Sequence, residues 1–173
     1  MIYSDLVLNK TVYNKLTSFE NMNHLPNAFI FHGDEGVGKE SMAIEFAAYI
    51  NCHSPLNDSA CNTCKSCQKI KNNNHEFIQY IFPLPRGKIT SKKDSVMKSF
   101  TEKTLSEYNY ELKTKLTNPF HKIHINGANT ILINSIRTIK KNLYQTIGDD
   151  YQRIIMIFEA EKLCHPNQEA GNS

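Results

Sequence analysis

Four of the five cysteines in the chain fall within one short segment. They are Cys52, Cys61, Cys64 and Cys67, with the spacing C-x8-C-x2-C-x2-C. Two cysteines separated by two residues can bring both thiolates to one ion without straining the backbone, and four thiolates complete the tetrahedral shell of zinc. Because four protein ligands leave no coordination position open, the spacing predicts a structural zinc module at residues 52–67. Four reduced cysteines with no shared ligand are the disfavoured alternative.

A glycine-rich segment, FIFHGDEGVGKES, precedes the cysteines and contains most of a phosphate-binding loop. Gly33, Gly36 and Gly38 can turn backbone N–H groups toward phosphate oxygens, and Lys39 adds positive charge at the start of a helix. The segment follows a short apolar run and precedes an apolar helical pattern, which is the strand–loop–helix order that such a loop needs. We therefore expect these four residues to form the backbone cradle of a nucleotide site.

Both protein contacts to magnesium are missing from this pattern. Glu40 stands where a Ser or Thr hydroxyl would hold the ion. Phe158 stands where an Asp would end a neighbouring strand, although Glu159 follows it. A carboxylate at position 40 would also repel phosphates. We interpret the loop as degenerate, with no catalytic residue, and expect Glu40 to fill an empty site; bound ATP or ADP without hydrolysis is the alternative.

Alternating strand and helix patterns must position these residues, and they indicate an α/β fold with a mostly parallel sheet flanked by helices. Short apolar runs predict strands, and apolar residues at intervals of three and four predict helices. We expect helices in residues 6–25 and 39–52 and a third capped by Asn134 or Ser135, strands at residues 28–31, 77–85 and 154–158, an extended piece at 130–133, and a turn at 148–150. Ile136, Ile139 and Leu143 would form the buried stripe of the third helix.

The composition is that of one globular domain spanning residues 1–173. Of the 173 residues, 40% are hydrophobic and 21% are charged, with a formal net charge of +3. No apolar run is long enough to span a membrane, and no secretion signal begins the chain, so we expect a cytoplasmic protein with reduced cysteines. Residues 86–122 read as a partly helical, charged surface insertion. The polar C-terminal end suggests a chain cut within a domain, and Cys164 would be a buried apolar thiol.

Three cations, Arg137, Lys140 and Lys141, fall on one face of the third predicted helix. Clustered cations of this kind can contact the phosphate backbone of DNA. A solvated surface is the commoner outcome for such a face, so DNA contact is the weaker of the two interpretations.

Taken together, the chain resembles the N-terminal region of a bacterial DNA polymerase III clamp-loader subunit of the AAA+ family. The resemblance rests on NAFIFHGDEGVGKES, on the four-cysteine module directly after the following helix, on INSIRTIKK, and on IIMIFEAEKL and NQEAGNS. It covers residues 27–173, with 86–122 as a variable insertion. A four-cysteine module at this place is characteristic of the gamma/tau and delta-prime subunits.

Within that family, the replacements at Glu40 and Phe158 imply a delta-prime subunit, since delta-prime subunits often lack the magnesium ligands. Such a subunit would hold a structural zinc ion and would help the gamma/tau and delta subunits to load the sliding clamp onto primed DNA, without hydrolysing ATP. In the family the domain continues into a further helix, an arginine that reaches the neighbouring ATP site, a lid domain and a collar. We therefore expect these parts to lie beyond residue 173.

Two alternatives stay open. The chain could be a gamma/tau-type ATPase that uses Lys39 and Glu159, which would show magnesium-dependent ATP turnover. It could instead be a zinc-knuckle nucleic-acid-binding module with an incidental glycine loop, which predicts salt-dependent binding to nucleic acid by the chain alone. Few aromatic residues lie between the cysteines to stack on bases, which disfavours this second alternative.

Overall fold

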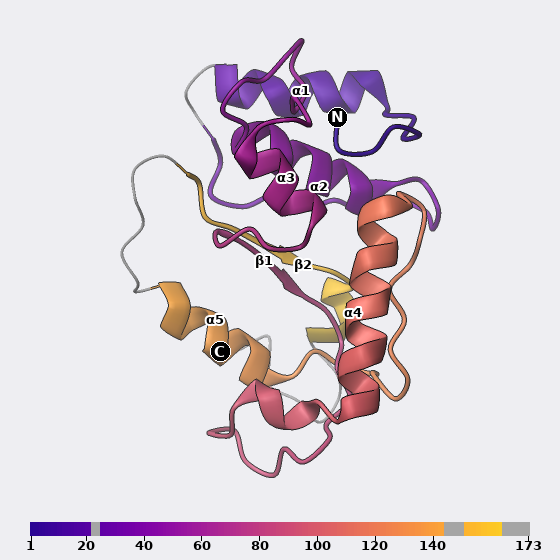
Figure 1. Cartoon of the computed structure of the whole chain (residues 1–173), viewed down its shortest axis with the longest axis vertical. Coiled ribbons are helices and arrows are strands. Elements are labelled where there is room, and N and C mark those ends of the chain that lie inside the picture. The colour runs from indigo at the N-terminus through magenta and orange to yellow at the C-terminus, as the bar shows by residue number, and fades with distance from the viewer. Residues whose placement is uncertain (22–24, 144–150, 164–173) are drawn as a thin grey trace. The chain divides into compact units, whose positions relative to one another are not determined.

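The computed structural model describes residues 1–21, 25–143 and 151–163 (Figure 1). The elements in chain order are α1 (Lys10–Asn21), α2 (Lys39–Ile50), α3 (Lys65–Lys71), β1 (Ile78–Ile81), the 3-10 helix η1 (Val96–Ser99), α4 (Glu102–Thr117), α5 (Ile133–Leu143), β2 (Ile154–Ile157) and the 3-10 helix η2 (Ala160–Leu163). The first of two compact units comprises Met1–Ile78, Lys113–Lys122 and Gln152–Ile154, and the second contains the other described residues. None of the helices in the described ranges is long and apolar enough to cross a membrane.

The helix α2 is the centre of the first unit, because nearly all of its surface is covered. Of its 12 residues, 8 are buried, and a helix that is apolar on most sides is stable only inside a protein. The helix α1 packs on it through a core cluster of Tyr13, Leu16, Met42, Phe46 and Tyr49. The helix predicted for residues 39–52 is confirmed and ends at Ile50. The helix predicted within residues 6–25 is also confirmed; the Asn9 side chain accepts the Val12 N–H at 3.2 Å and thereby caps its start.

The strand predicted at residues 28–31 is wrong. Phe29 and Phe31 pack against the core cluster, whereas the Ile30 side chain is 90% exposed. A strand needs neighbouring backbone to complete its hydrogen bonds. Among the residues that the structure describes, no strand pairs with this segment. The apolar run therefore marked a contact with α2 and not a place in the sheet.

The strands β1 and β2 pair in parallel, and they confirm, in shorter form, the strands predicted at residues 77–85 and 154–158. The Phe158 N–H donates to the Ile81 carbonyl at 2.8 Å, and the Tyr80 ring stacks on Phe158 with 5.9 Å between centroids. Within the described ranges β2 pairs with β1 alone, so it lies at an edge of this two-stranded sheet. The extended piece predicted at residues 130–133 is not part of β1 or β2, and α5 already begins at Ile133. Its backbone still makes two hydrogen bonds to other segments, from the Leu84 N–H to the Thr130 carbonyl and from the Ile131 N–H to the Lys162 carbonyl, both at 3.2 Å.

Residues 86–122, expected to be a partly helical surface insertion, contain η1 and α4. One face of α4 is interior rather than surface. Its Tyr108 ring lies 5.1 Å from the rings of both Phe82 and Phe100, measured between centroids, and Leu112 and Leu116 are buried. The expected helix is therefore confirmed, and its inner face contributes to the protein core.

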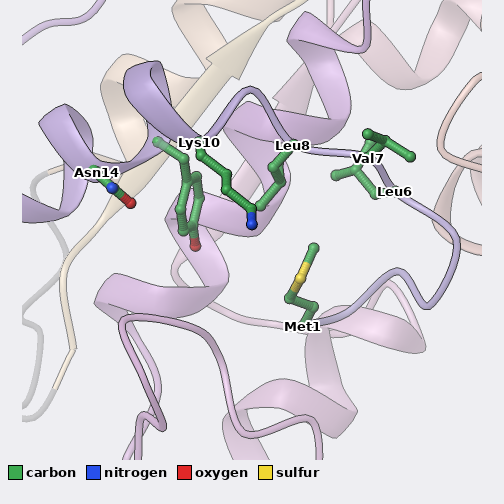
Figure 2. Close-up of a pocket in the computed structure, with 7 residues that line it drawn as sticks. Met1, Leu6, Val7, Leu8, Lys10 and Asn14 are labelled. Atoms are coloured by element: carbon green, nitrogen blue, oxygen red, sulfur yellow. The ribbon is translucent and has the colours of Figure 1, made fainter.

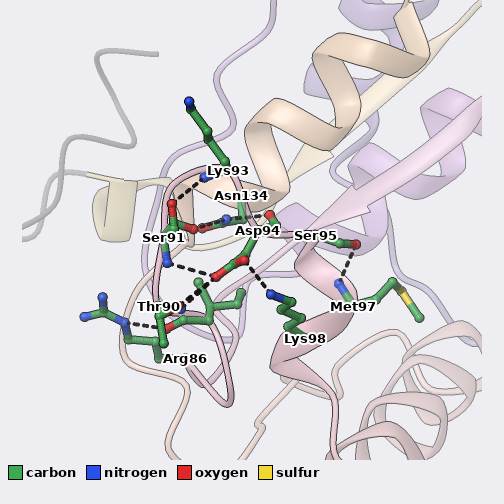
Figure 3. Close-up of polar contacts among 10 residues, drawn as sticks. Arg86, Thr90, Ser91, Lys93, Asp94, Ser95, Met97, Lys98 and Asn134 are labelled. Atoms are coloured by element: carbon green, nitrogen blue, oxygen red, sulfur yellow. Dashed lines mark hydrogen bonds and ion pairs between the residues drawn. The ribbon is translucent and has the colours of Figure 1, made fainter.

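The helix α5 begins at Ile133, so the predicted cap by Asn134 or Ser135 is wrong. Both residues lie in the first turn and are buried. The Asn134 side chain instead donates to the carbonyl oxygens of Ser91 at 3.1 Å and Asp94 at 2.7 Å (Figure 3). An amide group that is buried must find such partners, so Asn134 fastens the loop before η1 to α5.

The same loop is closed by the Asp94 carboxylate, which pairs with Lys98 at 2.5 Å and accepts the N–H groups of Thr90 and Ser91 at 2.9 Å (Figure 3). The Lys98 ammonium and these two donors hold the pKa of Asp94 far below its ordinary value. The carboxylate is therefore charged at any ordinary pH and keeps the loop closed.

The buried stripe predicted for α5 is only partly present. Ile136 and Ile139 are half-buried, whereas Leu143 is exposed. The turn predicted at residues 148–150 and the burial predicted for Cys164 both fall outside the residues that the structure describes.

An acid, Glu45, lies within the buried surface of α2. Its Oε1 atom accepts the Tyr3 N–H at 2.5 Å, while its Oε2 atom has no hydrogen-bond partner among the described residues. Burial raises the pKa of Glu45 above its ordinary value, and the N–H groups of Tyr3 and Ile2 offset part of that rise. The folded protein thus holds this proton more tightly than the unfolded chain does. Its contribution to stability is present below the unfolded pKa and is lost as the pH rises through the folded pKa.

We expect Glu45→Gln to flatten the pH dependence of stability. Glutamine keeps the oxygen that receives the Tyr3 N–H but has no charge to bury, so the decline in the free energy of unfolding as the pH rises above the ordinary glutamate pKa of about 4.3 should shrink. Urea denaturation at several pH values measures this, with the exposed Glu102→Gln as a control that keeps the wild-type profile. A profile as steep as the wild type in Glu45→Gln would contradict the expectation.

Candidate functional site

The four predicted cysteine ligands come together in the first unit. The Sγ atoms of Cys52, Cys61, Cys64 and Cys67 all lie within 4.8 Å of one another. Two of the separations are 4.0 Å, for Cys52–Cys64 and Cys61–Cys67, and the Cys52–Cys67 separation is 3.7 Å. Four sulfurs bound tetrahedrally at about 2.3 Å from a zinc ion would lie about 3.8 Å apart. The cluster therefore has the size of a four-thiolate metal site.

A tight hairpin brings the first cysteine to the others. Between the first two cysteines, Leu56 and Ser59 exchange both backbone hydrogen bonds at 2.9 Å. The two residues at the tip, Asn57 and Asp58, have φ angles of 48° and 57°. Asn and Asp tolerate this left-handed region better than most other residues. The long spacer therefore folds back on itself instead of separating its two cysteines.

The short helix α3 positions the last two cysteines. Cys64 is the residue before its first turn, and Cys67 lies one turn further along. Residues three apart on a helix share a face, so both sulfurs point the same way. The Gln68 side chain donates to the Asn62 carbonyl at 2.8 Å and fixes the segment that enters the helix.

Hydrogen bonds also prepare one of these sulfurs for the charged state. The Cys61 sulfur accepts the Thr63 hydroxyl at 3.5 Å and the Cys64 N–H at 3.3 Å. These donors, led by Thr63, lower the pKa of the Cys61 thiol to about 5. Burial raises the pKa values of Cys52 and Cys67. Because thiolates are the metal-binding form, a bound cation would offset the burial of those two charges.

The glycine loop, residues 33–39, adopts conformations that its glycines allow. Gly36 and Gly38 have φ angles of 82° and 79°, and α2 begins directly after Gly38. This places the free N–H groups of the first turn of α2 beside the loop. The Lys39 ammonium donates to the Asp34 carbonyl at 2.9 Å. Thus the structure gathers Gly33, Gly36, Gly38 and Lys39 into one turn at a helix N-terminus.

Glu40 forms an ion pair with a residue that the sequence analysis did not identify. Its Oε2 atom lies 2.7 Å from the Nζ atom of Lys115, near the end of α4. The next residue, Ser41, donates its hydroxyl to the Pro119 carbonyl. An ion pair screens the carboxylate, so the repulsion of phosphates expected from an unpaired Glu40 is reduced. The position of Lys115 between Leu112 and Leu116, which mark the buried face of α4, was the only signal in the sequence.

The other replaced position belongs to the second unit. Phe158, at the end of β2, is buried and stacked on Tyr80, so an aromatic ring stands where a carboxylate was expected. Glu159 follows with a φ angle of 53° and forms an ion pair with Lys162. Neither residue presents an unpaired acid at the end of this strand.

The first unit contains a small pocket of about 290 Å³. Residues that line it are drawn in Figure 2. Its walls come from the N-terminal segment and the start of α1, namely Met1, Leu6, Val7, Leu8, Lys10, Tyr13 and Asn14. The Leu6 side chain also borders the glycine loop, since a Cβ atom placed on Gly38 would lie 3.5 Å from Leu6 Cδ1. The volume is at the lower limit of small-molecule sites, so the pocket has room for a small group and not for a whole nucleotide.

A family model described as "DNA polymerase III, delta subunit" matches residues 8–173. The delta′ subunit of DNA polymerase III from Pseudomonas aeruginosa is 28% identical over 71% of this chain and 35% of its own length. The gamma/tau subunit from Mycoplasma pneumoniae is 34% identical over 41% of this chain and 10% of its own length. Protein STICHEL-like 4 from Arabidopsis thaliana is 29% identical over 47% of this chain and 8% of its own length.

The chain belongs to the clamp-loader family of DNA polymerase III. The resemblance drawn from the glycine loop, the cysteines and the strand at β2 is thereby confirmed. The clamp-loader chain spans about a third of the delta′ relative and a smaller share of the other two. Both delta′ and gamma/tau subunits are similar to it, so likeness alone leaves the subunit type open.

We expect this clamp-loader chain to bind a single divalent ion tetrahedrally through its four cysteines. Titration with Co²⁺ reports such a site by the visible absorption of a tetrahedral thiolate complex. Cys67→Ser removes the most buried ligand and should weaken binding by about tenfold or more. Cys164→Ser changes the one cysteine outside the cluster and should bind as the wild type does. Equal weakening in both variants, or no saturation at one ion per chain, would contradict a four-cysteine site.

Proposed function

We propose that this chain is part of a delta-prime-type clamp-loader subunit, which helps gamma/tau and delta subunits to load a sliding clamp onto primed DNA and does not hydrolyse ATP itself. The proposal rests mainly on the identity of the residue that follows the loop lysine, Lys39. A hydroxyl is needed there to hold magnesium. Glu40 replaces it, and the Glu40 carboxylate is paired with Lys115 at 2.7 Å.

A second replacement supports the same proposal independently. The acid that would complete a magnesium site at the end of a strand is absent at position 158, where Phe158 is buried against Tyr80. The following acid, Glu159, is paired with Lys162. The residues present therefore do not fit a magnesium–nucleotide site, and no catalytic step is assigned to them. The loop backbone and Lys39 retain what binding a phosphate group requires, so ATP or ADP without turnover is compatible with this proposal.

The metal in the cysteine cluster is proposed to be zinc. Four sulfur ligands at tetrahedral separations favour zinc among the common biological ions, and they leave no position for a substrate. The ion would therefore act in folding, by holding the hairpin of residues 56–59 and the helix α3 to the end of α2. When bound, it supplies stability and no chemistry.

Contact with primed DNA is proposed for the second unit. Lys140 and Lys141 are exposed on α5, whereas the guanidinium of Arg137 donates to the Lys92 carbonyl at 2.8 Å. The loop that Asn134 fastens to α5 adds further exposed cations, namely Arg86, Lys88, Lys92 and Lys93. Such clustering of cations supports contact with a phosphate backbone. The sequence analysis had identified only the cations of α5.

The loop lysine gives the sharpest test of the non-hydrolysing role. In a clamp loader reconstituted with its partner subunits, Lys39→Ala in this subunit should change the rate of DNA-stimulated ATP hydrolysis by less than about twofold, since no chemistry is assigned here. The loop lysine of the gamma/tau subunit is the matched control, and its replacement should abolish most turnover. A large loss from Lys39→Ala would instead assign this chain to the ATP-hydrolysing gamma/tau type.

The partners are tested by purifying the full-length protein from its own cells and identifying what accompanies it by mass spectrometry. Gamma/tau and delta subunits together with the sliding clamp are the expected companions. Recovery alone, or with nucleic-acid-binding proteins unrelated to replication, would reject the clamp-loader role. Salt-dependent binding of the isolated chain to nucleic acid would then favour a zinc-knuckle module.

The DNA contact predicts a dependence on salt. Replacing Lys140 and Lys141 together by Ala should weaken binding of the assembled loader to primed DNA about equally for all sequences. The slope of log K against log salt concentration should fall in magnitude by roughly 1 to 2, because up to two counterions fewer are released. Lys103→Ala with Lys113→Ala, two exposed lysines of α4, is the control pair. If the slope of log K against log salt concentration is unchanged in the α5 variant, α5 does not contact the DNA.

A further inference from the structure

Lys115 is a buried cation whose contacts lie within the first unit. Its side chain is 4% exposed, and its Nζ atom lies 2.7 Å from Glu40 Oε2. The same atom donates to the carbonyl oxygens of His121 at 2.7 Å and Pro119 at 3.2 Å. The Glu40 side chain is 27% exposed, so solvent reaches the carboxylate more than it reaches the ammonium.

An ammonium group has three N–H donors and no acceptor. Here the three donors meet three oxygen atoms, so the buried charge of Lys115 is both paired and fully hydrogen-bonded. One carboxylate oxygen and two carbonyl oxygens are also the ligands that hard metal cations take from proteins. The surroundings of the Lys115 ammonium are therefore a small oxygen cage with a cation inside.

We propose that Lys115 is a tethered cation that permanently fills a cation-binding cage formed by Glu40, Pro119 and His121. The cage is built on the residue that follows the loop lysine, where a nucleotide-binding loop would use an exchangeable metal ion. A free cation enters only when the lysine side chain is removed, because two positive charges cannot share the cage. This inference does not rest on the subunit type or on any partner.

A second ion pair lies near the first one in the sequence, joins the glycine loop to the segment after α4, and has the opposite character. Lys122 lies 2.7 Å from Glu35 of the glycine loop, and their side chains are 58% and 80% exposed. Water screens such a pair, so its contribution to stability is small. The chain thus offers a control in which an identical pair of residue types connects the loop to the segment after α4 at an exposed position.

The experiment is chemical rescue in the full-length protein. Lys115→Ala should lower Tm by about 5–10 °C, since it leaves a partly buried carboxylate and two carbonyl oxygens without their common donor. Ethylammonium chloride, which replaces the lost ammonium and part of its stem, should restore at least about half of that loss by binding the folded state. Tetramethylammonium chloride at equal concentration has no N–H donors and should restore none. Lys122→Ala should change Tm by less than about 2 °C and should not respond to either salt.

Two outcomes would overturn the proposal. One is a Lys115→Ala protein that is as stable as the wild type. The other is a destabilised protein that responds equally to both salts, which would mean that Lys115 acts through the packing of its stem. Because these are stabilities of the isolated protein, either result leaves the proposed role in the clamp loader untouched.

A second set of variants covers the case in which Lys115→Ala does not fold. Lys115→Met keeps the stem, and adding Glu40→Gln removes the charge that Met leaves unpaired. The double variant should therefore be more stable than Lys115→Met alone, with Tm within about 3 °C of the wild type. Additive losses from the two substitutions would show that the two charges are not coupled, and the cage would be rejected.

Discussion

The burial of α2 is the constraint on which the first unit depends. This helix is covered on most sides, so packing along its length fixes its position in the unit. With 12 residues it is a rod about 18 Å long. The glycine loop precedes its N-terminus, and Cys52 follows shortly after its C-terminus. The side chain of Asn51 closes that end by exchanging hydrogen bonds with the backbone of Gln152 at 2.8 and 3.1 Å.

A rigid helix of this kind explains why two unrelated sites can be built from local sequence. The cysteine cluster needs only a hairpin and one turn of α3 to close on the end of α2. The glycine loop needs only the positive φ angles that its glycines supply. Neither site requires the strands β1 and β2 to set its geometry, because both are made within the first unit.

Polar side chains of the glycine loop and of the start of α2 are bonded within the protein. Lys39 donates to a carbonyl of the loop itself, and Glu40 and Ser41 are tied to the end of α4 and the turn that follows it. A hydrolysing site must instead release and rebuild its contacts in every cycle. An arrangement already satisfied by its own side chains is consistent with a nucleotide-type fold kept as a scaffold, which is the role proposed for this chain in the loader.

The sequence by itself determined the features that depend on residues close together along the chain. The cysteine cluster, the turn of glycines before α2, the helices α1, α2, α4 and α5, and the two paired strands all follow from spacing, glycine positions and apolar periodicity. Predictions from local patterns of this kind hold in the folded structure, because each pattern depends on the residues of one segment only. The family, too, could be inferred from these motifs, and the comparisons confirmed it.

Only the tertiary structure decided which charges and apolar runs meet across long stretches of chain. The run at residues 28–31 looked like a strand, yet a strand exists only where another backbone lies beside it, and here α2 takes its side chains instead. Asn134 looked like a cap but binds a loop far back in the sequence. Glu40 looked like an unpaired charge, and its partner Lys115 stands 75 residues away. Such pairings cannot be read from periodicity, because they arise from the packing of whole elements against one another.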